Sequence, residues 1–445
     1  MNSTLITNAK IVNEGKVFEG DVLIKGQFIE KIDTHIDYPA NHTVDAKGNF
    51  LLPGVIDDQV HFREPGLTHK GNIFTESRAA VAGGVTTFME MPNTSPPAFT
   101  QALLEDKYQI AARTSLANYS FYIGASNDNL EEILKTNLKN VCGLKIFMGS
   151  STGNLLVDDP KTLDGIFSRF PSLIATHCED EPTIRKNTTE FKERYGEDMN
   201  VKYHSQIRSE EACYKSSSFA VDLAKKHGTK LHILHISSAK ETHLFGNSIP
   251  LEKKKITAEA CVHHLWFNDQ DYDRLGMLIK WNPAIKTEQD QNEILKALLD
   301  DRIDVVATDH APHTLEEKAS KYFQAPSGGP LIQHTLVAMM EFVHQKKISI
   351  EKMVQKMSHN PAILFEVEKR GFIREGYFAD LVLLDPNQPW KVNKNNILSK
   401  CGWSPFEGNT FHSVINQTWV SGHLAYSKGQ LLEGKSGERL TFHRP

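Results

Sequence analysis

The stretch Leu51–Gly66, LLPGVIDDQVHFREPG, is an apolar run followed by polar residues and a glycine turn. Barrel enzymes place their chemistry where strands end in polar side chains before a loop. Residues two apart in a strand point to the same side, so positions 59, 61 and 63 are expected to face one cavity. There His61 suits a metal and Arg63 suits an anion. Gln59 is unusual, because an imidazole binds a transition metal better than a neutral amide does.

The same pattern, an apolar run that ends in polar residues, recurs through the middle of the chain, residues 53–369. Eight short apolar strand candidates alternate there with helical stretches, and several end in His, Lys, Asp or Asn. The candidates are GVIDDQVHF, VTTFMEMPN, NYSFYIGAS, GLKIFMGSS, SLIATHCED, KLHILHISS, KITAEACVHHL and DVVATDHAPH. A doubly wound open sheet would give the same alternation. The repeated polar strand ends favour a (β/α)₈ TIM-type barrel, which carries its site at the carboxyl ends of the strands.

The two ends of the chain differ from the middle. Residues 1–52 and 370–445 read as short strands joined by turns, as in DVLIKGQFIEKI and SVINQTWVSGHLAYSKGQLL. Neither end alone supplies a sheet with much of a core. We therefore predict a small composite β-sandwich domain built from both termini, beside a metal-dependent α/β barrel.

Composition limits the classes of function. The 445 residues are 40% hydrophobic and 24% charged, with a formal net charge of −5, which argues against a nucleic-acid or membrane surface as the main partner. No apolar run approaches the ~20 residues of a bilayer span. The five cysteines are scattered without a C-x-x-C pair, and the start lacks a secretory pattern. We expect a cytoplasmic protein that binds a small-molecule substrate.

Polar residues at other strand ends are candidate metal ligands. Lys145 lies inside an apolar strand, where an unpaired ammonium is costly, so it either snorkels or is used, for example as a carbamate that bridges two metals. His177 ends its strand, and its neighbour Cys178 should point away. His232 and His235 are three apart, so only one can face the cavity, and His235 is nearer the strand end.

The last candidates lie near the end of the barrel segment. His263 and His264 are adjacent, so they too cannot both face the cavity. Asp309 follows an apolar run, and burying its carboxylate is expensive unless a cation meets it. His310 is its opposite-facing neighbour, and His313 lies on the loop beyond. One His, Lys, His, His and Asp thus end strands one, four, five, six and eight, a ligand set that suits Zn²⁺ and related ions.

These motifs, taken in order, resemble those of the dihydroorotases in the amidohydrolase superfamily. The resemblance is carried by LPGVIDDQVHFREPG, MPNTSPP, GLKIFMGSS, THCEDE, HILHISS, TAEACVHHL, KWNPAIKTE and VVATDHAPHTLEEK, with FIREGYFADLVLLDP and SPFEG in the β-domain. It implies a metal-dependent cyclic amidohydrolase of de novo pyrimidine (UMP) biosynthesis, which interconverts N-carbamoyl-L-aspartate and L-dihydroorotate.

The resemblance also implies roles for the site residues. His61 and Asp309 would serve one Zn²⁺, His177 and His235 a second, with carbamylated Lys145 as the bridge. Asp309 would also carry the proton between the attacking water and the leaving amide nitrogen. Substrate contacts would come from Arg63, which suits a carboxylate, and from Asn93, Asn282, His313, Ser327 and Gly328.

The chain departs from the family pattern at one ligand. The family has His-x-His where this chain has Gln59 and His61. Asp58 should face the other side of the strand and cannot simply substitute. Gln59 would coordinate weakly through its amide oxygen or leave its position to water. We therefore predict a functional site with one or two Zn²⁺ per chain, the ion at His61 and Asp309 being held more weakly.

Two other functions stay open. Hydantoinases and allantoinases share the scaffold and the metal ring, but Arg63 and Asn93 suit a substrate with a free carboxylate, which a hydantoin lacks. A catalytically inactive dihydroorotase-like scaffold subunit would account for Gln59, yet the other ligands are present. A homodimer and an association with aspartate carbamoyltransferase are the partner hypotheses. The long segment between His177 and His235 is expected to be an elaborated helical loop.

Overall fold

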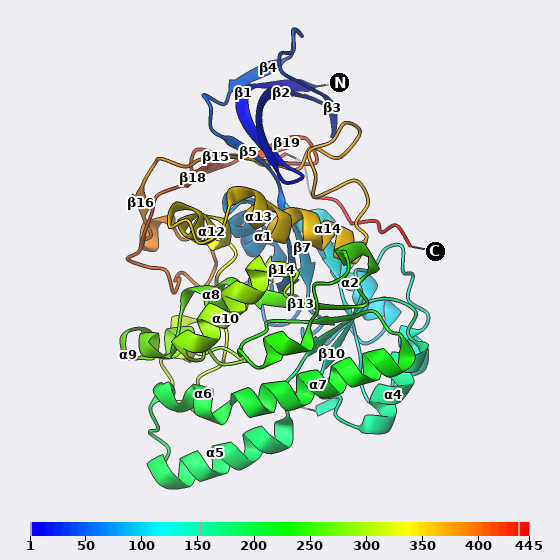
Figure 1. Ribbon diagram of the computed structural model, residues 1–445, viewed down its shortest axis with the longest axis vertical. Coiled ribbons are helices and arrows are strands. Elements are labelled where there is room, and N and C mark those ends of the chain that lie inside the picture. Colours follow the sequence, from blue (N-terminus) through cyan, green and yellow to red (C-terminus); the bar gives the residue numbers. More distant parts are fainter. Residues whose placement is uncertain (1, 152, 435–436, 445) are drawn as a thin grey trace.

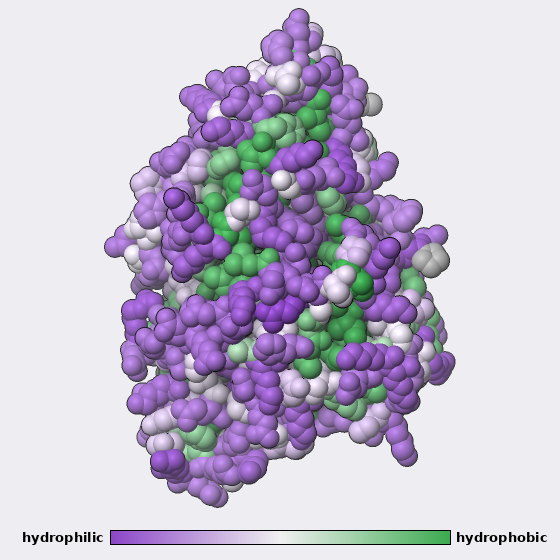
Figure 2. All heavy atoms as spheres, viewed as in Figure 1, coloured by the Kyte–Doolittle hydropathy of each residue, from purple (hydrophilic) through white to green (hydrophobic). Residues whose placement is uncertain are grey.

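The computed structural model describes residues 2–151, 153–434 and 437–444. It confirms the predicted fold class, an α/β barrel with a β-domain built from both termini (Figure 1). The β-domain lies at one end of the molecule, and helices from the middle of the chain lie at the other. Figure 2 shows a mostly hydrophilic face with hydrophobic side chains gathered in patches. Within these described ranges, no helix is long and apolar enough to cross a membrane.

The eight barrel strands lie where the sequence predicted them. They are β6 (Val55–Val60), β7 (Val85–Glu90), β8 (Asn118–Phe121) continued by β9 (Ile123–Gly124), β10 (Leu144–Phe147), β11 (Ile174–His177), β12 (Leu231–Ile233), β13 (Ile256–Cys261) and β14 (Val305–Ala307). All their pairings are parallel. A parallel bridge between Val60 and His310 joins the first strand to the end of the last, so the barrel is closed.

Helices connect the strands and cover the barrel. They are α1 (Ile73–Ala82), α2 (Gln101–Thr114), α3 (Leu130–Ile133), α4 (Pro160–Arg169), α5 (Glu181–Tyr195), α6 (His204–Ile207), α7 (Glu210–His227), α8 (Val262–Trp266), α9 (Tyr272–Leu275), α10 (Glu288–Leu299), α11 (Leu315–Lys318), α12 (Thr335–His344), α13 (Ile350–Val354), a π-helical turn (Gln355–His359) and α14 (Asn360–Phe365). Residues 130–138, LEEILKTNL, are helix-like in sequence but form only the single turn α3.

The long connection between β11 and β12 is helical. Ser209 caps α7 by accepting a hydrogen bond from the backbone NH of Ala212, and Gly228 ends the helix with a left-handed φ of 69°. Helix α5 lies beside α7 at the end of the molecule away from the β-domain (Figure 1). This part of the chain is therefore an elaborated helical loop.

The two chain ends share one mostly antiparallel sheet. Its strands are β1 (Ser3–Asn13), β2 (Lys16–Lys25), β3 (Phe28–Asp33), β4 (His42–Asp45), β5 (Phe50–Pro53), β15 (Leu381–Asp385), β18 (Val414–Val420), β19 (His423–Ser427) and β20 (Gln430–Leu431), with β16 (Trp390–Lys391) and β17 (Thr410–Phe411) as a separate pair. The pairing of β5 with β15 joins the two ends. A buried apolar cluster that includes Ile11, Leu51 and Trp419 draws on both of them.

Candidate metal centre and substrate pocket

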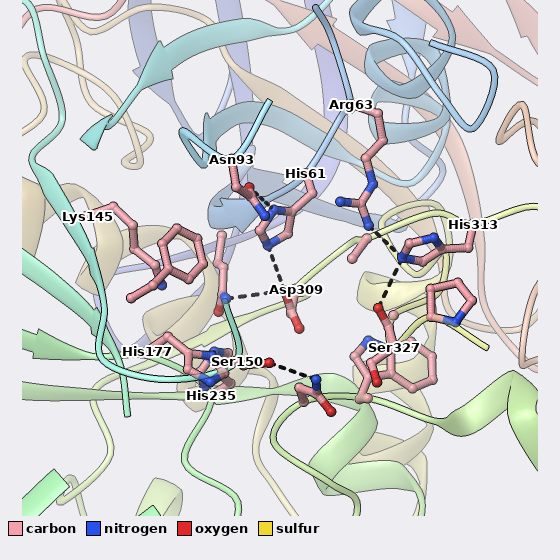
Figure 3. Close-up of a pocket in the computed structure, with 17 residues that line it drawn as sticks. His61, Arg63, Asn93, Lys145, Ser150, His177, His235, Asp309, His313 and Ser327 are labelled. Carbon is pink, nitrogen blue, oxygen red and sulfur yellow. Dashed lines mark hydrogen bonds and ion pairs between the residues drawn. The ribbon is translucent and has the colours of Figure 1, made fainter. Parts of the chain in front are cut away.

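The predicted site residues gather in one cavity of about 240 Å³ (Figure 3). All twelve side chains or backbone positions named from the sequence line it: Gln59, His61, Arg63, Asn93, Lys145, His177, His235, Asn282, Asp309, His313, Ser327 and Gly328. Lys145, His177 and His235 lie on one side of this cavity, and Arg63 and His313 lie on the other. The arrangement follows from the barrel, because residues at the carboxyl ends of its strands converge on one mouth.

His177 and His235 form the first converging pair. His177 Nδ1 lies 3.0 Å from His235 Nε2, close to the roughly 3.3 Å that separates two nitrogens on one tetrahedral zinc ion. On its other side, His177 Nε2 donates to Glu179 Oε2 at 2.8 Å, and Arg208 also holds that carboxylate, at 2.5 Å. This hydrogen bond leaves a lone pair on Nδ1 toward His235. Nδ1 of His235 is buried without a hydrogen-bond partner in the described chain.

His61 and Asp309 form the second converging pair. His61 Nε2 lies 3.1 Å from Asp309 Oδ1, while His61 Nδ1 lies 2.7 Å from Asn93 Oδ1. When Nδ1 donates to Asn93, Nε2 turns a lone pair toward the carboxylate, and two acceptors at this distance fit a cation between them. Burial lowers the pKa of His61, of His177 and, strongly, of His235, so these imidazoles are neutral, the form that binds metals.

Lys145 is buried on the same side of the cavity as His177 and His235. Its side chain is 1% exposed, its Nζ lies over the ring of Phe147 at 4.6 Å, and no ion pair to it occurs in the part of the chain that the structure describes. Burial lowers the pKa of Lys145 to about 7, although Asp309 and Glu259 oppose this shift. A substantial fraction of the amine is therefore neutral near pH 7, which is the form that reacts with CO₂.

Gln59 is turned toward Asp309. Its Nε2 donates to Asp309 Oδ1 at 3.2 Å, and its Oε1 lies 3.8 Å from the thiol of Cys261. In this orientation Gln59 holds the carboxylate and presents no ligand oxygen to the cavity's metal side. Asp58 does not line the cavity. The metal position predicted at His61 and Asp309 would thus have one ligand fewer than a His-x-His pattern provides.

The other side of the cavity carries a buried positive charge. Arg63 has a left-handed φ of 69°, donates through Nε to the Pro312 carbonyl at 3.1 Å and lies with Nη2 3.0 Å from His313 Nε2. Burial lowers the pKa of Arg63 to about 10, so the guanidinium stays charged at neutral pH. No carboxylate of the described residues makes an ion pair with Arg63. Burial, Arg63 and Lys70 strongly lower the pKa of His313, which is therefore neutral.

Polar groups that can form further hydrogen bonds line the rest of the cavity. Asn282 donates to Ser150 Oγ at 2.7 Å, while its buried Oδ1 lacks a hydrogen-bond partner in the described chain. Gly328 has a φ of 121°, and a Cβ there would stand 2.6 Å from the Ala311 carbonyl oxygen. A side chain at position 328 would therefore clash with Ala311, so glycine is needed where this turn lines the cavity.

Several residues of the site were missed from the sequence. Phe147, Ser150, Trp281, Ala311 and Pro326 line the cavity but were not named. Glu179 was missed as the partner of His177, although it follows His177 by two positions and the same-side rule would have found it. Arg208 lies on the α6–α7 connection, and nothing in the sequence indicates that it reaches Glu179.

A closed barrel with paired ligand atoms, a buried lysine and an aspartate at its mouth defines a metal-dependent hydrolase. The chain belongs to the amidohydrolase family, which matches residues 50–425. It is similar to proteins named dihydroorotase. The one from Methanosarcina mazei is 32% identical over 91% of this chain and 90% of that protein, and the one from Carboxydothermus hydrogenoformans is 33% identical over 96% and 98%. The resemblance to dihydroorotases is thereby confirmed.

Solved structures show the same fold. The L-hydantoinase (dihydropyrimidinase) from Arthrobacter aurescens superposes with a TM-score of 0.93 at 26% identity, covering 99% of this chain and 100% of that one. The dihydropyrimidinase from Brevibacillus agri superposes with a TM-score of 0.89 at 24% identity over the full length of both chains, a likeness of fold alone.

Proposed function

We propose that this chain is a dihydroorotase, which reversibly cyclises N-carbamoyl-L-aspartate to L-dihydroorotate in de novo pyrimidine biosynthesis. The observation that carries the proposal is Arg63. Its buried guanidinium opens into the same cavity as the metal-ligand pairs and has no ion-pair partner in the described chain. A substrate carboxylate matches the two parallel donors of this planar group.

The donor set fits two divalent metal ions, which we propose to be Zn²⁺. His177 and His235 would hold one ion and His61 and Asp309 the other, with Lys145, as a carbamate, between them. When bound, the metals lower the pKa of water and polarise the ring carbonyl. Glu179 supports this role, because it fixes the tautomer of His177 and leaves Nδ1 free to bind.

Asp309 is the residue that we propose to move the proton. It ends the last barrel strand, is 5% exposed and is held by Gln59 and His61 through the same oxygen, Oδ1. In ring opening it would take a proton from the attacking water and deliver it to the amide nitrogen as the C–N bond breaks. In ring closure the same proton would travel in the opposite direction.

The remaining cavity groups would orient the substrate. Asn282 Oδ1 offers an acceptor to a ring NH, and the backbone at Ser327 and Gly328 lies close enough to contact the ring directly. His313 is neutral beside Arg63, so it can accept or donate a hydrogen bond without repelling the guanidinium. All five cysteines are free thiols, which agrees with a reducing cytoplasm, where we propose that the enzyme acts.

A hydantoinase is the second candidate, because the fold matches the Arthrobacter aurescens enzyme with a TM-score of 0.93. A hydantoin carries no free carboxylate and would leave Arg63 buried and unpaired, which is unfavourable. The test is ring opening of L-dihydroorotate and of hydantoin by the purified protein, before and after metal removal and zinc readdition. We expect metal-dependent turnover of dihydroorotate only. Turnover of hydantoin alone would establish the second candidate, and no turnover under any metal loading would indicate the inactive scaffold.

A further inference from the structure

A second cluster of ligand-type side chains lies inside the barrel, outside the cavity. It consists of Asp58 on β6, His232 on β12 and Glu259 on β13, and one ligand atom from each lies within 4.8 Å of the others. All three residues are fully buried, at 0% exposure. β11 pairs Ala175 with His232, so His232 lies two residues, or about 6.6 Å, below the level of His177. The cluster therefore sits one layer beneath the proposed metal centre.

A register shift in β6 brings Asp58 into this layer. Asp57 pairs with Phe88 and Val60 with Glu90, so β6 has one more residue than β7 over this stretch. Regular alternation would place Asp58 and Gln59 on opposite faces of the strand. With the extra residue, Gln59 lines the cavity while the carboxylate of Asp58 reaches His232 in the barrel interior.

The hydrogen bonds fix the tautomer of His232. Thr257 donates its hydroxyl proton to the Leu231 carbonyl at 3.2 Å and therefore accepts from His232 Nδ1, which lies 2.9 Å away. With its proton on Nδ1, a neutral His232 presents the lone pair of Nε2 to the two acids. That nitrogen lies 3.1 Å from Asp58 Oδ2 and 3.9 Å from Glu259 Oε2. Three acceptors thus face one another.

One oxygen atom of each carboxylate has no hydrogen-bond partner among the described residues. Asp58 Oδ1 and Glu259 Oε2 are buried without a hydrogen bond to any described residue. The other oxygen of Glu259 accepts from the His235 backbone NH at 2.8 Å and from Cys261 at 3.2 Å. No lysine or arginine of the described residues pairs with either acid. Burial, and next the charge of Asp58, raise the pKa of Glu259 well above its usual value, as expected for acids that lack a counter-charge.

We propose that Asp58, His232 and Glu259 bind a zinc ion in the barrel interior, separate from the metals of the catalytic cavity. Two carboxylates and a neutral imidazole are a ligand set that zinc accepts. A divalent ion would balance both charges and separate the three facing atoms, Nε2 of His232, Oδ2 of Asp58 and Oε2 of Glu259. A shared proton is the competing occupant, because it too would separate the acceptors.

Zinc-edge anomalous diffraction tests the proposal on crystals of the full-length protein produced with ZnCl₂. The expected result is an anomalous peak between Asp58, His232 and Glu259. Absence of this peak, whether or not zinc occupies the cavity above, would overturn the proposal and leave the shared proton. The map does not depend on a variant folding, and it does not depend on whether the cavity has dihydroorotase activity.

Zinc content per chain gives a second measurement. Asp58→Asn keeps the size of the side chain but removes its charge, and Glu259→Gln does the same for the second acid. Each variant is expected to lose one zinc per chain relative to the wild type, whereas the matched cavity variant His177→Asn should retain the interior peak in the anomalous map. Equal zinc content in the wild type and both folded acid variants would contradict an interior ion.

Discussion

Restoring an imidazole at position 59 should strengthen the weaker metal position. Gln59 Nε2 lies 3.2 Å from Asp309 Oδ1, and His61 Nε2 lies 3.1 Å from the same oxygen, so Gln59→His would bring a third ligand to one point. Four protein ligands bind structural zinc with about 10–16 kcal/mol, or about 2.5–4 kcal/mol each. Because a water molecule in place of the missing ligand would retain part of this, we expect a gain of about 2–3 kcal/mol, which is about 30- to 150-fold in affinity.

The assay is titration of metal-free Gln59→His and wild-type protein with zinc against a chromophoric chelator. In the wild type we expect two separated binding events in the cavity, and in the variant the weaker one should move toward the tighter one. Gln59→Leu is the matched control, because it fills similar space without a ligand atom, and it should bind no more tightly than the wild type. Identical zinc affinities for Gln59→His and Gln59→Leu would refute the reasoning that position 59 faces a metal.

Three further predictions concern single residues of the cavity. Arg63→Met should lower kcat/KM for dihydroorotate by about 10²- to 10³-fold, the effect of losing a charge-assisted carboxylate pair of roughly 3–4 kcal/mol. The exposed Arg185→Met should leave kcat/KM unchanged, and an equal loss in both variants would argue against a substrate carboxylate. Glu179→Gln should weaken zinc binding at His177 by about 10- to 100-fold, measured by competition with a chelator, because it replaces the charged acceptor that orients the ring with a neutral amide. In metal-free protein the pKa of Lys145 is about 7, so its neutral amine predominates above that pH and falls about tenfold per unit below it. The initial rate of carbamate formation from ¹³C-labelled CO₂, followed by NMR, should show this dependence, and a rate at pH 6 equal to that at pH 8 would contradict it.

The barrel could be predicted because its strands carry a strong local signal. Each of the eight strands is an apolar segment that ends in polar residues, and all eight lie where that pattern indicated. The stretch after Leu130 was less informative, because its helix ends after one turn at Ile133 although Leu138 beyond it still packs against the core. The chain end was also hard to assign. Leu440 and Phe442 pack against the barrel core, although their segment has the strand-like composition of the β-domain.

Most residues that line the cavity could be predicted from the sequence, but the hydrogen bonds between them could not. The same-side rule placed His61 and Arg63 with Gln59 on one cavity, and all three line it. The rule misplaced Asp58, because a sequence does not reveal a register shift between neighbouring strands. The same-side rule also gave no indication of Arg208, which contacts Glu179 only because the helices between β11 and β12 fold back over the barrel.

The proposed ion sites share one arrangement of hydrogen bonds. In each, an imidazole is held by a hydrogen bond on its outer nitrogen: His177 by Glu179, His61 by Asn93 and His232 by Thr257. For His61 and His232 the inner nitrogen then faces a carboxylate oxygen, a second acceptor, at 3.1 Å, whereas for His177 it faces Nε2 of His235 at 3.0 Å. Two acceptors at this distance are unfavourable in a dry interior unless a positive charge separates them, so the hydrogen bonds that orient His61 and His232 also favour a cation. Gln59 lessens this effect at His61, since its amide can satisfy Asp309 by donating a hydrogen bond without any metal. The glutamine therefore weakens the preference for an ion between His61 and Asp309, while the preference at His232 is unchanged.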